Sequence, residues 1–232
     1  PFVDAGWRVL TADWPGNGRS GDYDAECTVE LIVDCFEELV ERTVGWERPI
    51  VICGHSAGGA IAQMIYLRAP ERTSALILLQ TSSRFMDGGL LPAVNVFMPA
   101  YKAVLKHPAV VGAASTALRT LRDAGASFLN EDNSVMIYLE TGAMLPENKH
   151  FAEEAEAFAN LNLDGLLGEI SAPTLIVGSC LDQVIPLGRV KALHRGIAGS
   201  ELRVISRPGH NAVLHFADEV NVLMRDFLLS RV

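Results

Sequence analysis

One short segment limits the possible folds of this chain more than any other: residues 54–58, with the sequence Gly-His-Ser-Ala-Gly. An apolar run at 50–53 leads into it, and an apolar-periodic helical candidate follows it. A G-x-S-x-G segment between a strand and a helix is typical of a nucleophilic serine on a sharp turn, with its hydroxyl clear of the sheet. We expect Gly54 and Gly58 to be required because a Cβ would block the approach of the two backbones. The pattern predicts Ser56 as a nucleophile.

A serine nucleophile needs a base and a third group that orients the base. Asp182 follows a strand-like run at 173–179, and His210 follows another run at 201–206. Both therefore lie at the carboxyl ends of expected strands, where open parallel sheets place their ligands and their chemistry. We expect Ser56, His210 and Asp182 to meet there.

The apolar runs alternate between two periods along the chain. Strands are expected at 7–13, 50–53, 75–80, 173–179 and 201–206, and helices near 28–43, 58–69, 186–196 and 214–229. This alternation predicts a doubly wound α/β domain with a mostly parallel sheet.

The alternation breaks between residues 84 and 170, where no convincing strand is found. Helical candidates at 91–105, 110–121, 134–144 and 151–161 are separated by proline, glycine and asparagine. We expect a helical cap or lid at 84–170, inserted into a core of 1–83 and 171–232. The alternative is a helical excursion packed beside the sheet.

The order Ser56, Asp182, His210 and two further segments resemble the α/β-hydrolase superfamily, specifically its capped serine hydrolases, over essentially all 232 residues. Residues 13–20 are similar to the loop after the family's fourth strand, and residues 70–79 to the approach to its sixth. The resemblance implies Ser56 as nucleophile, His210 as general base and then acid, and Asp182 as the orienting carboxylate. It also implies that the backbone N–H of Ala57 donates to the oxyanion.

Some family members place the acid after the sixth strand, and Asp87 is the candidate for that position in this chain. Residues 2–6 resemble the tail of the family's first helix. The resemblance therefore implies that the chain is a fragment that lacks the first three strands and the loop supplying the second oxyanion donor, which makes its own activity doubtful. We expect a gap beside 7–13, or that strand displaced against the one near residue 50.

Charge and composition restrict the partners. The net charge is −9 and no basic run occurs, which argues against nucleic acid. Residues 84–170 contain six Lys/Arg against eleven Asp/Glu, so small neutral or apolar substrates are favoured over polyanions. No run is long enough to span a membrane, although 88–101 leaves a membrane-touching lid as an alternative to cap lining.

The four cysteines lack metal-ligand spacing, so neither a metal nor a cofactor is expected. Cys53 and Cys180 fall in expected strands and are interpreted as buried packing residues, which favours a reducing, cytoplasmic location; a signal peptide upstream stays open. Residues 16–21 satisfy G-x-G-x-x-G, but an acidic stretch instead of a helix follows them, which argues against a dinucleotide site.

The predicted activity is hydrolysis of an ester, a lactone or a related acyl bond through an acyl-enzyme. Haloperoxidase-like perhydrolysis and cleavage of an activated C–C bond use the same machinery and stay open. Dehalogenases and epoxide hydrolases of the superfamily use an aspartate nucleophile and are disfavoured by Ser56. The alternative of a different class is a ligand-sensing or binding protein on the same fold. The substrate and the oligomeric state are not predicted.

Overall fold

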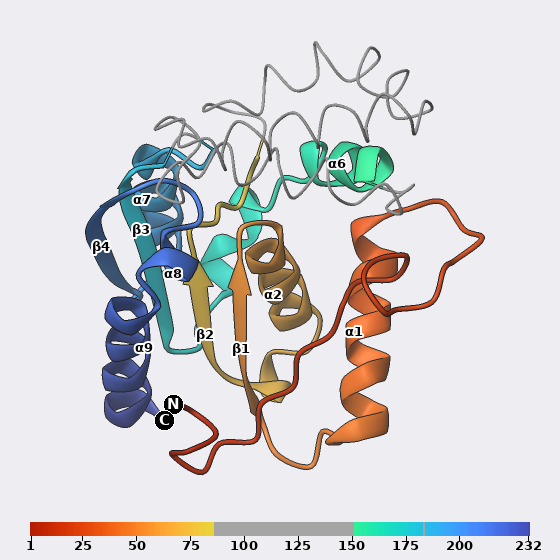
Figure 1. Ribbon diagram of the computed structural model, residues 1–232, viewed down its shortest axis with the longest axis horizontal. Helices are drawn as coiled ribbons and strands as arrows, with labels where there is room; N and C mark the ends of the chain where they lie inside the picture. Colours follow the sequence, from red (N-terminus) through yellow and green to blue (C-terminus); the bar gives the residue numbers. More distant parts are fainter. Residues whose placement is uncertain (86–150, 183) are drawn as a thin grey trace, which may run out of the picture.

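The computed structural model describes residues 1–85 and 151–232, with the exception of residue 183. Its centre is a parallel sheet with the strand order β1-β2-β3-β4 (Figure 1). The strands are β1 (Ile50–His55), β2 (Thr73–Leu79), β3 (Thr174–Leu181) and β4 (Glu201–Pro208). All four carboxyl ends therefore lie at one edge of the sheet, as the sequence predicted.

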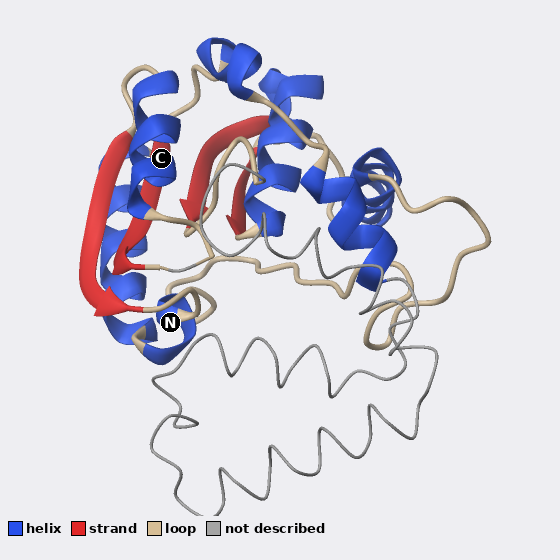
Figure 2. Cartoon of the chain, turned by 90° about the horizontal axis from the view of Figure 1, so that it is seen from above, coloured by secondary structure: helices blue, strands red, loops and turns tan. Residues whose placement is uncertain are grey.

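Helices connect the strands and cover both faces of the sheet (Figure 2). They are α1 (Val29–Thr43), α2 (Ala57–Arg68), η1 (Pro70–Arg72), α6 (Phe151–Ala159), η3 (Asp164–Glu169), α7 (Leu187–Gly196), α8 (Ala212–His215) and α9 (Ala217–Arg231). The first helix begins where the sequence allows it, because the Thr28 hydroxyl accepts a hydrogen bond from the Leu31 N–H at 3.1 Å and so caps a free backbone donor.

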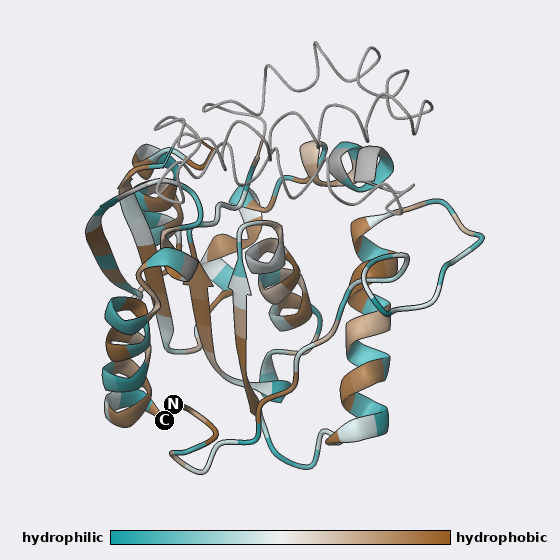
Figure 3. Cartoon of the chain, in the orientation of Figure 1, coloured by the Kyte–Doolittle hydropathy of each residue, from teal (hydrophilic) through white to brown (hydrophobic). Residues whose placement is uncertain are grey.

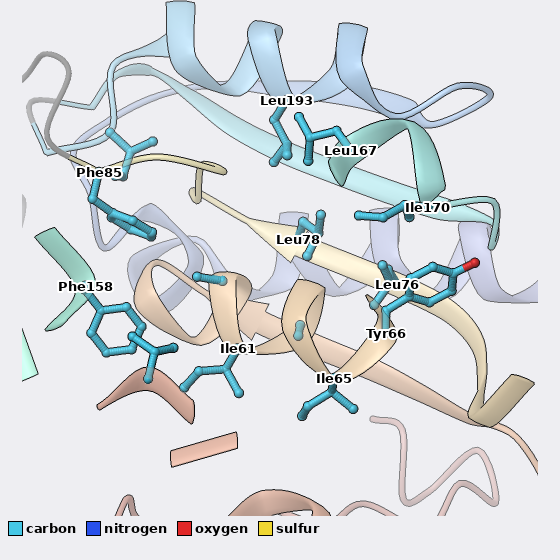
Figure 4. Close-up of a cluster of buried hydrophobic side chains, with 14 of the residues drawn as sticks. Ile61, Ile65, Tyr66, Leu76, Leu78, Phe85, Phe158, Leu167, Ile170 and Leu193 are labelled. Carbon is cyan, nitrogen blue, oxygen red and sulfur yellow. The ribbon is translucent and has the colours of Figure 1, made fainter. Parts of the chain in front are cut away.

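Alternate residues of the strands pack into two separate apolar cores. Leu76 and Leu78 of β2 face α1, α2, α7 and η3, whereas Ile77 faces α8 and α9. This follows from the two-residue period of a strand, and burial on both faces requires the continuous apolar runs seen in Figure 3. Figure 4 shows the first core, in which Ile61 of α2 and Leu193 of α7 lie on either side of Leu78. The expected α/β fold is confirmed.

The segment at 7–13 does not form the expected strand. All seven residues are exposed, and Figure 2 draws them as loop. A groove of about 780 Å³ lies between this segment and β1, lined by Trp7, Leu10 and Cys53 among others. A segment with strand propensity forms a strand only where it hydrogen-bonds to a neighbouring strand. Among the described strands, β1 pairs with β2 alone.

Two smaller expectations differ from the structure. The helix expected near 214–229 is present as α9, but it begins only at Ala217, and the short α8 precedes it across Phe216. Cys53 and Cys180 lie in strands but are exposed. Cys53 lines the groove along the edge strand β1, and Cys180 is the penultimate residue of β3, where the burial of that strand ends.

Only the two ends of the expected insertion are described. Helix α6 agrees with the candidate at 151–161, and η3 follows it. The candidates at 91–105, 110–121 and 134–144, together with Asp87, lie outside the described residues. Within the described part of the chain, no helix is both long and apolar enough to cross a membrane.

The glycine-rich stretch 16–21 forms a closed loop. The Gly16 N–H donates to the Gly21 carbonyl at 2.8 Å, and the next helix begins only at Val29. A dinucleotide site requires a helix that opens directly at the last glycine. The loop therefore lacks the arrangement on which that reading depends.

Candidate active site

Ser56 stands on the turn between β1 and α2, in a backbone conformation with φ 53° and ψ −123°. This conformation is strained for a residue with a side chain, and its neighbours hold it in place. The Ser56 N–H donates to the Leu79 carbonyl at 3.0 Å, and the Thr81 hydroxyl donates to the Ser56 carbonyl at 2.6 Å. The carboxyl end of β2 thus fixes the turn from both sides.

The glycines around the turn have different roles. A Cβ on Gly54 would lie 2.1 Å from the carbonyl oxygen of Gly58, and one on Gly59 would lie 2.5 Å from the Thr81 side chain. A Cβ on Gly58 meets no described atom within 4 Å. The steric requirement therefore applies to Gly54 and to Gly59, whereas the described atoms leave room for a methyl group at Gly58.

The structure brings the three predicted side chains into one hydrogen-bonded chain. His210 Nε2 lies 2.8 Å from Ser56 Oγ, and His210 Nδ1 lies 2.9 Å from Asp182 Oδ2. Because a carboxylate only accepts, Nδ1 carries the proton and Nε2 is left to accept from the serine hydroxyl. This arrangement can remove a proton from Ser56.

Asp182 is fixed by its own loop. Its Oδ1 accepts hydrogen bonds from the backbone N–H groups of Val184 and Ile185, both at 2.8 Å. The remaining oxygen, Oδ2, also accepts from Gln80 Nε2 at 3.1 Å. Gln80 was not among the predicted site residues; the only sequence signal for it is its place directly after a buried strand.

His55 occupies the variable position of the turn, and its role was left open between packing and substrate contact. Its Nε2 donates to the backbone carbonyl of His210 at 2.9 Å, and the two rings lie 4.9 Å apart. Burial, together with the neighbouring imidazole of His210, lowers the pKa of His55 to about 4. A neutral His55 thus supports the backbone that carries His210.

Ala57, the expected oxyanion donor, is the first residue of α2. The N–H groups in the first turn of a helix have no acceptor within the helix, and they lie at the positive end of its dipole. An oxyanion formed beside Ser56 would find such a donor there. The oxyanion role of Ala57 stays a prediction.

Known proteins resemble this chain along most of its length. A family profile described as the alpha/beta hydrolase fold matches residues 1–217. A 2-hydroxy-6-oxo-6-phenylhexa-2,4-dienoate hydrolase of Comamonas testosteroni is 31% identical over 239 residues, which cover 100% of this chain and 80% of the relative. A 2-hydroxy-6-oxononadienedioate/2-hydroxy-6-oxononatrienedioate hydrolase of Klebsiella pneumoniae is 30% identical over 98% of this chain and 78% of its own length.

Solved structures share the fold. The enol-lactonase of Burkholderia xenovorans LB400 matches with a TM-score of 0.72 at 18% identity, over 94% of this chain and 79% of its own. A thermophilic esterase of Thermogutta terrifontis matches with a TM-score of 0.73 at 23% identity, over 94% and 78%. The sheet, the turn at Ser56 and these likenesses agree: the chain belongs to the α/β-hydrolase fold family, and it is a hydrolase.

Proposed function

We propose that this protein hydrolyses an acyl bond of a small molecule through a covalent intermediate on Ser56. The observation that carries the proposal is the continuous hydrogen-bonded chain from Ser56 Oγ through His210 to Asp182. A serine hydroxyl is a weak nucleophile unless a positioned base takes its proton. Here a base and its orienting carboxylate are both within reach, and both are buried.

In the first half of the reaction, Ser56 Oγ attacks the carbonyl carbon and its proton moves to His210 Nε2. The negative charge on the former carbonyl oxygen is stabilised by backbone donors, of which Ala57 N–H is one. Asp182 stabilises the imidazolium across the bond to Nδ1. When the tetrahedral intermediate collapses, His210 gives the proton to the leaving group, and the acyl group stays on Ser56.

In the second half, a water molecule attacks the acyl carbon and loses a proton to His210 Nε2. The bond between the acyl carbon and Ser56 Oγ then breaks, and the serine oxygen recovers the proton from His210. The products are the leaving group in its protonated form and a carboxylic acid. Atoms and charges balance without any further co-reactant.

The first candidate substrates are neutral esters and lactones. The protein carries a net charge of −9, and such a surface does not attract anions from solution. An ester or lactone needs only the nucleophile, the base and the oxyanion donors. The esterase and lactonase whose folds resemble this one support a small-molecule substrate only at the level of the fold.

The second candidate is cleavage of a carbon–carbon bond next to a ketone. Bacterial hydrolases named for a 2-hydroxy-6-oxo dienoate or dienedioate are 28–31% identical to this chain over at least 98% of its length, which is the observation that favours it. The leaving group is then bonded through carbon, so His210 must deliver the proton to a carbon atom instead of an oxygen atom. A dienoate substrate also carries a carboxylate, which needs a cationic partner in the pocket.

The deciding experiment compares p-nitrophenyl esters of increasing chain length, a panel of lactones and a 2-hydroxy-6-oxo-dienoate under the same conditions. Sustained turnover that Ser56→Ala abolishes would support the proposal, and the ranking of kcat/KM would choose between the candidates. A single acylation event per chain, without turnover, would contradict hydrolysis and favour a sensing role. Turnover that survives in Ser56→Ala would contradict the mechanism itself.

A further inference from the structure

Gln80 is the residue that follows β2 directly, and its side chain is completely buried. Its backbone is left-handed, with φ 44°, and its N–H donates to the Val177 carbonyl at 2.7 Å. Residues other than glycine seldom adopt this conformation, and Asn tolerates it better than Gln does. The conformation turns the Gln80 side chain away from the strand direction and toward the loops that carry Asp182 and His210.

The Gln80 amide uses its oxygen and its nitrogen on these two loops and on the first turn of α8. Its Nε2 donates to Asp182 Oδ2 at 3.1 Å and to the Gly209 carbonyl at 2.7 Å, while its Oε1 accepts from the Val213 N–H at 3.2 Å. Gly209 immediately precedes His210. One side chain thus joins the end of β2 to the carboxylate and to the backbone on both sides of the histidine.

The contact with Asp182 has an electrostatic consequence. Oδ2 accepts from both His210 Nδ1 and Gln80 Nε2, so the amide takes up part of the negative charge that faces the imidazole. An imidazolium is stabilised less by a carboxylate that is already shared. Gln80 therefore sets the position of Asp182 and shares the negative charge that Asp182 presents to the imidazole.

We propose that Gln80 is a positioning residue of the hydrolytic site, which holds Asp182 and the His210 loop in register and shares the carboxylate charge that faces the imidazole. The inference rests on the proposed function, since it assumes that His210 acts as the base. In this role Gln80 acts through Asp182 and the backbone on either side of His210. Asp182 and His55 are titratable side chains that contact His210, and both stay unchanged in the tests below.

Two substitutions of Gln80 distinguish a positioning role from a role in packing alone. Gln80→Leu fills the space but removes both donors, whereas Gln80→Asn keeps an amide and suits the left-handed backbone but is one methylene too short to reach Asp182. The matched control is Gln63→Leu, because Gln63 is an equally buried glutamine whose Nε2 donates only to the Gly59 and Ser82 carbonyls. Each purified variant is assayed for kcat, KM and melting temperature across pH, with the best substrate from the panel above.

We expect both Gln80 variants to lose roughly tenfold or more in kcat with KM changed by less than about threefold. The pH at which kcat/KM is half-maximal on the acid side should move upward, since a carboxylate that is no longer shared favours the protonated base. Gln63→Leu should lower the melting temperature without moving that pH. Should Gln80→Leu fail to fold, Gln80→Asn carries the same expectation.

An unmoved acid-side midpoint in the folded Gln80 variants, or the same shift in Gln63→Leu, would overturn the inference. The proposed function has a separate readout, because it requires Ser56→Ala to be inactive whatever Gln80 does. If Ser56→Ala is inactive but the Gln80 variants keep the kinetics and the pH profile of the wild type, only the positioning role is contradicted. An active Ser56→Ala would contradict the mechanism on which the positioning role of Gln80 rests.

Discussion

Asp182 Oδ2 and His210 Nδ1 lie 2.9 Å apart, and their side chains are only 1% and 2% exposed. A hydrogen bond to a carboxylate is stronger where water does not compete for it. Replacing Asp182 by Asn removes the charge and allows His210 to adopt the tautomer with its proton on Nε2. We expect Asp182→Asn to lower kcat by roughly 10³–10⁴-fold with native folding retained, measured by steady-state kinetics and circular dichroism.

The matched comparison for this prediction is Asp87→Asn, since Asp87 was the alternative acid. We expect that variant to keep kcat within about threefold of the wild type. A larger loss of kcat in Asp87→Asn than in Asp182→Asn would transfer the orienting role to Asp87.

The lowered pKa of His55 predicts how the free energy of unfolding depends on pH. Its pKa is about 4 in the folded protein, against 6.5 in the unfolded chain. Above pH 6.5 the residue is neutral in both states; below it, the unfolded chain binds a proton that the folded chain does not. The free energy of unfolding should therefore fall between pH 6.5 and 4, by on the order of 2 kcal/mol from this residue after allowance for its partial exposure.

Urea titrations of the wild type and of His55→Gln at several pH values test this expectation. Glutamine keeps a donor for the His210 carbonyl but does not titrate, so its curve should decline less steeply below pH 6.5. Parallel curves for the two proteins would show that His55 does not contribute.

The sequence was sufficient for the parts of the site that depend on local pattern. The G-x-S-x-G segment predicted Ser56 on its turn, and two apolar runs placed Asp182 and His210 at the same edge of the sheet. These inferences succeed because all parallel strands deliver their carboxyl ends to one side. The roles of His55 and Gln80 depend on contacts between residues 102 to 155 positions apart in the chain, which no local pattern contains.

The expectations that differ from the structure also depend on contacts that no local pattern contains. Residues 7–13 have a strand-like pattern, but a strand forms only where it hydrogen-bonds to a neighbour, and a groove of about 780 Å³ separates these residues from the edge strand β1. Likewise, Cys53 lies in a strand as expected, yet the burial of a strand residue depends on what covers it. No proline or glycine marks the break at Phe216 between α8 and α9, so the sequence did not indicate it.

The glycines of the turn predict a contrast between two otherwise similar variants. Gly54→Ala places a methyl group 2.1 Å from the Gly58 carbonyl oxygen, so backbone must shift, and we expect a loss of at least about 3 kcal/mol in unfolding free energy. Gly58→Ala meets no described atom and should change stability by less than about 1 kcal/mol. Thermal and urea unfolding of the two variants measure the contrast, and equal losses would contradict the steric account.

Covalent labelling of Ser56 tests the central claim most directly. A fluorophosphonate probe reacts with a serine that a neighbouring base has activated, and it needs no knowledge of the substrate. We predict that the wild type is labelled at one site, found by peptide mass spectrometry to be Ser56, and that Ser56→Ala is not labelled although its circular dichroism spectrum is unchanged. Equal labelling of the wild type and of folded Ser56→Ala would contradict the account.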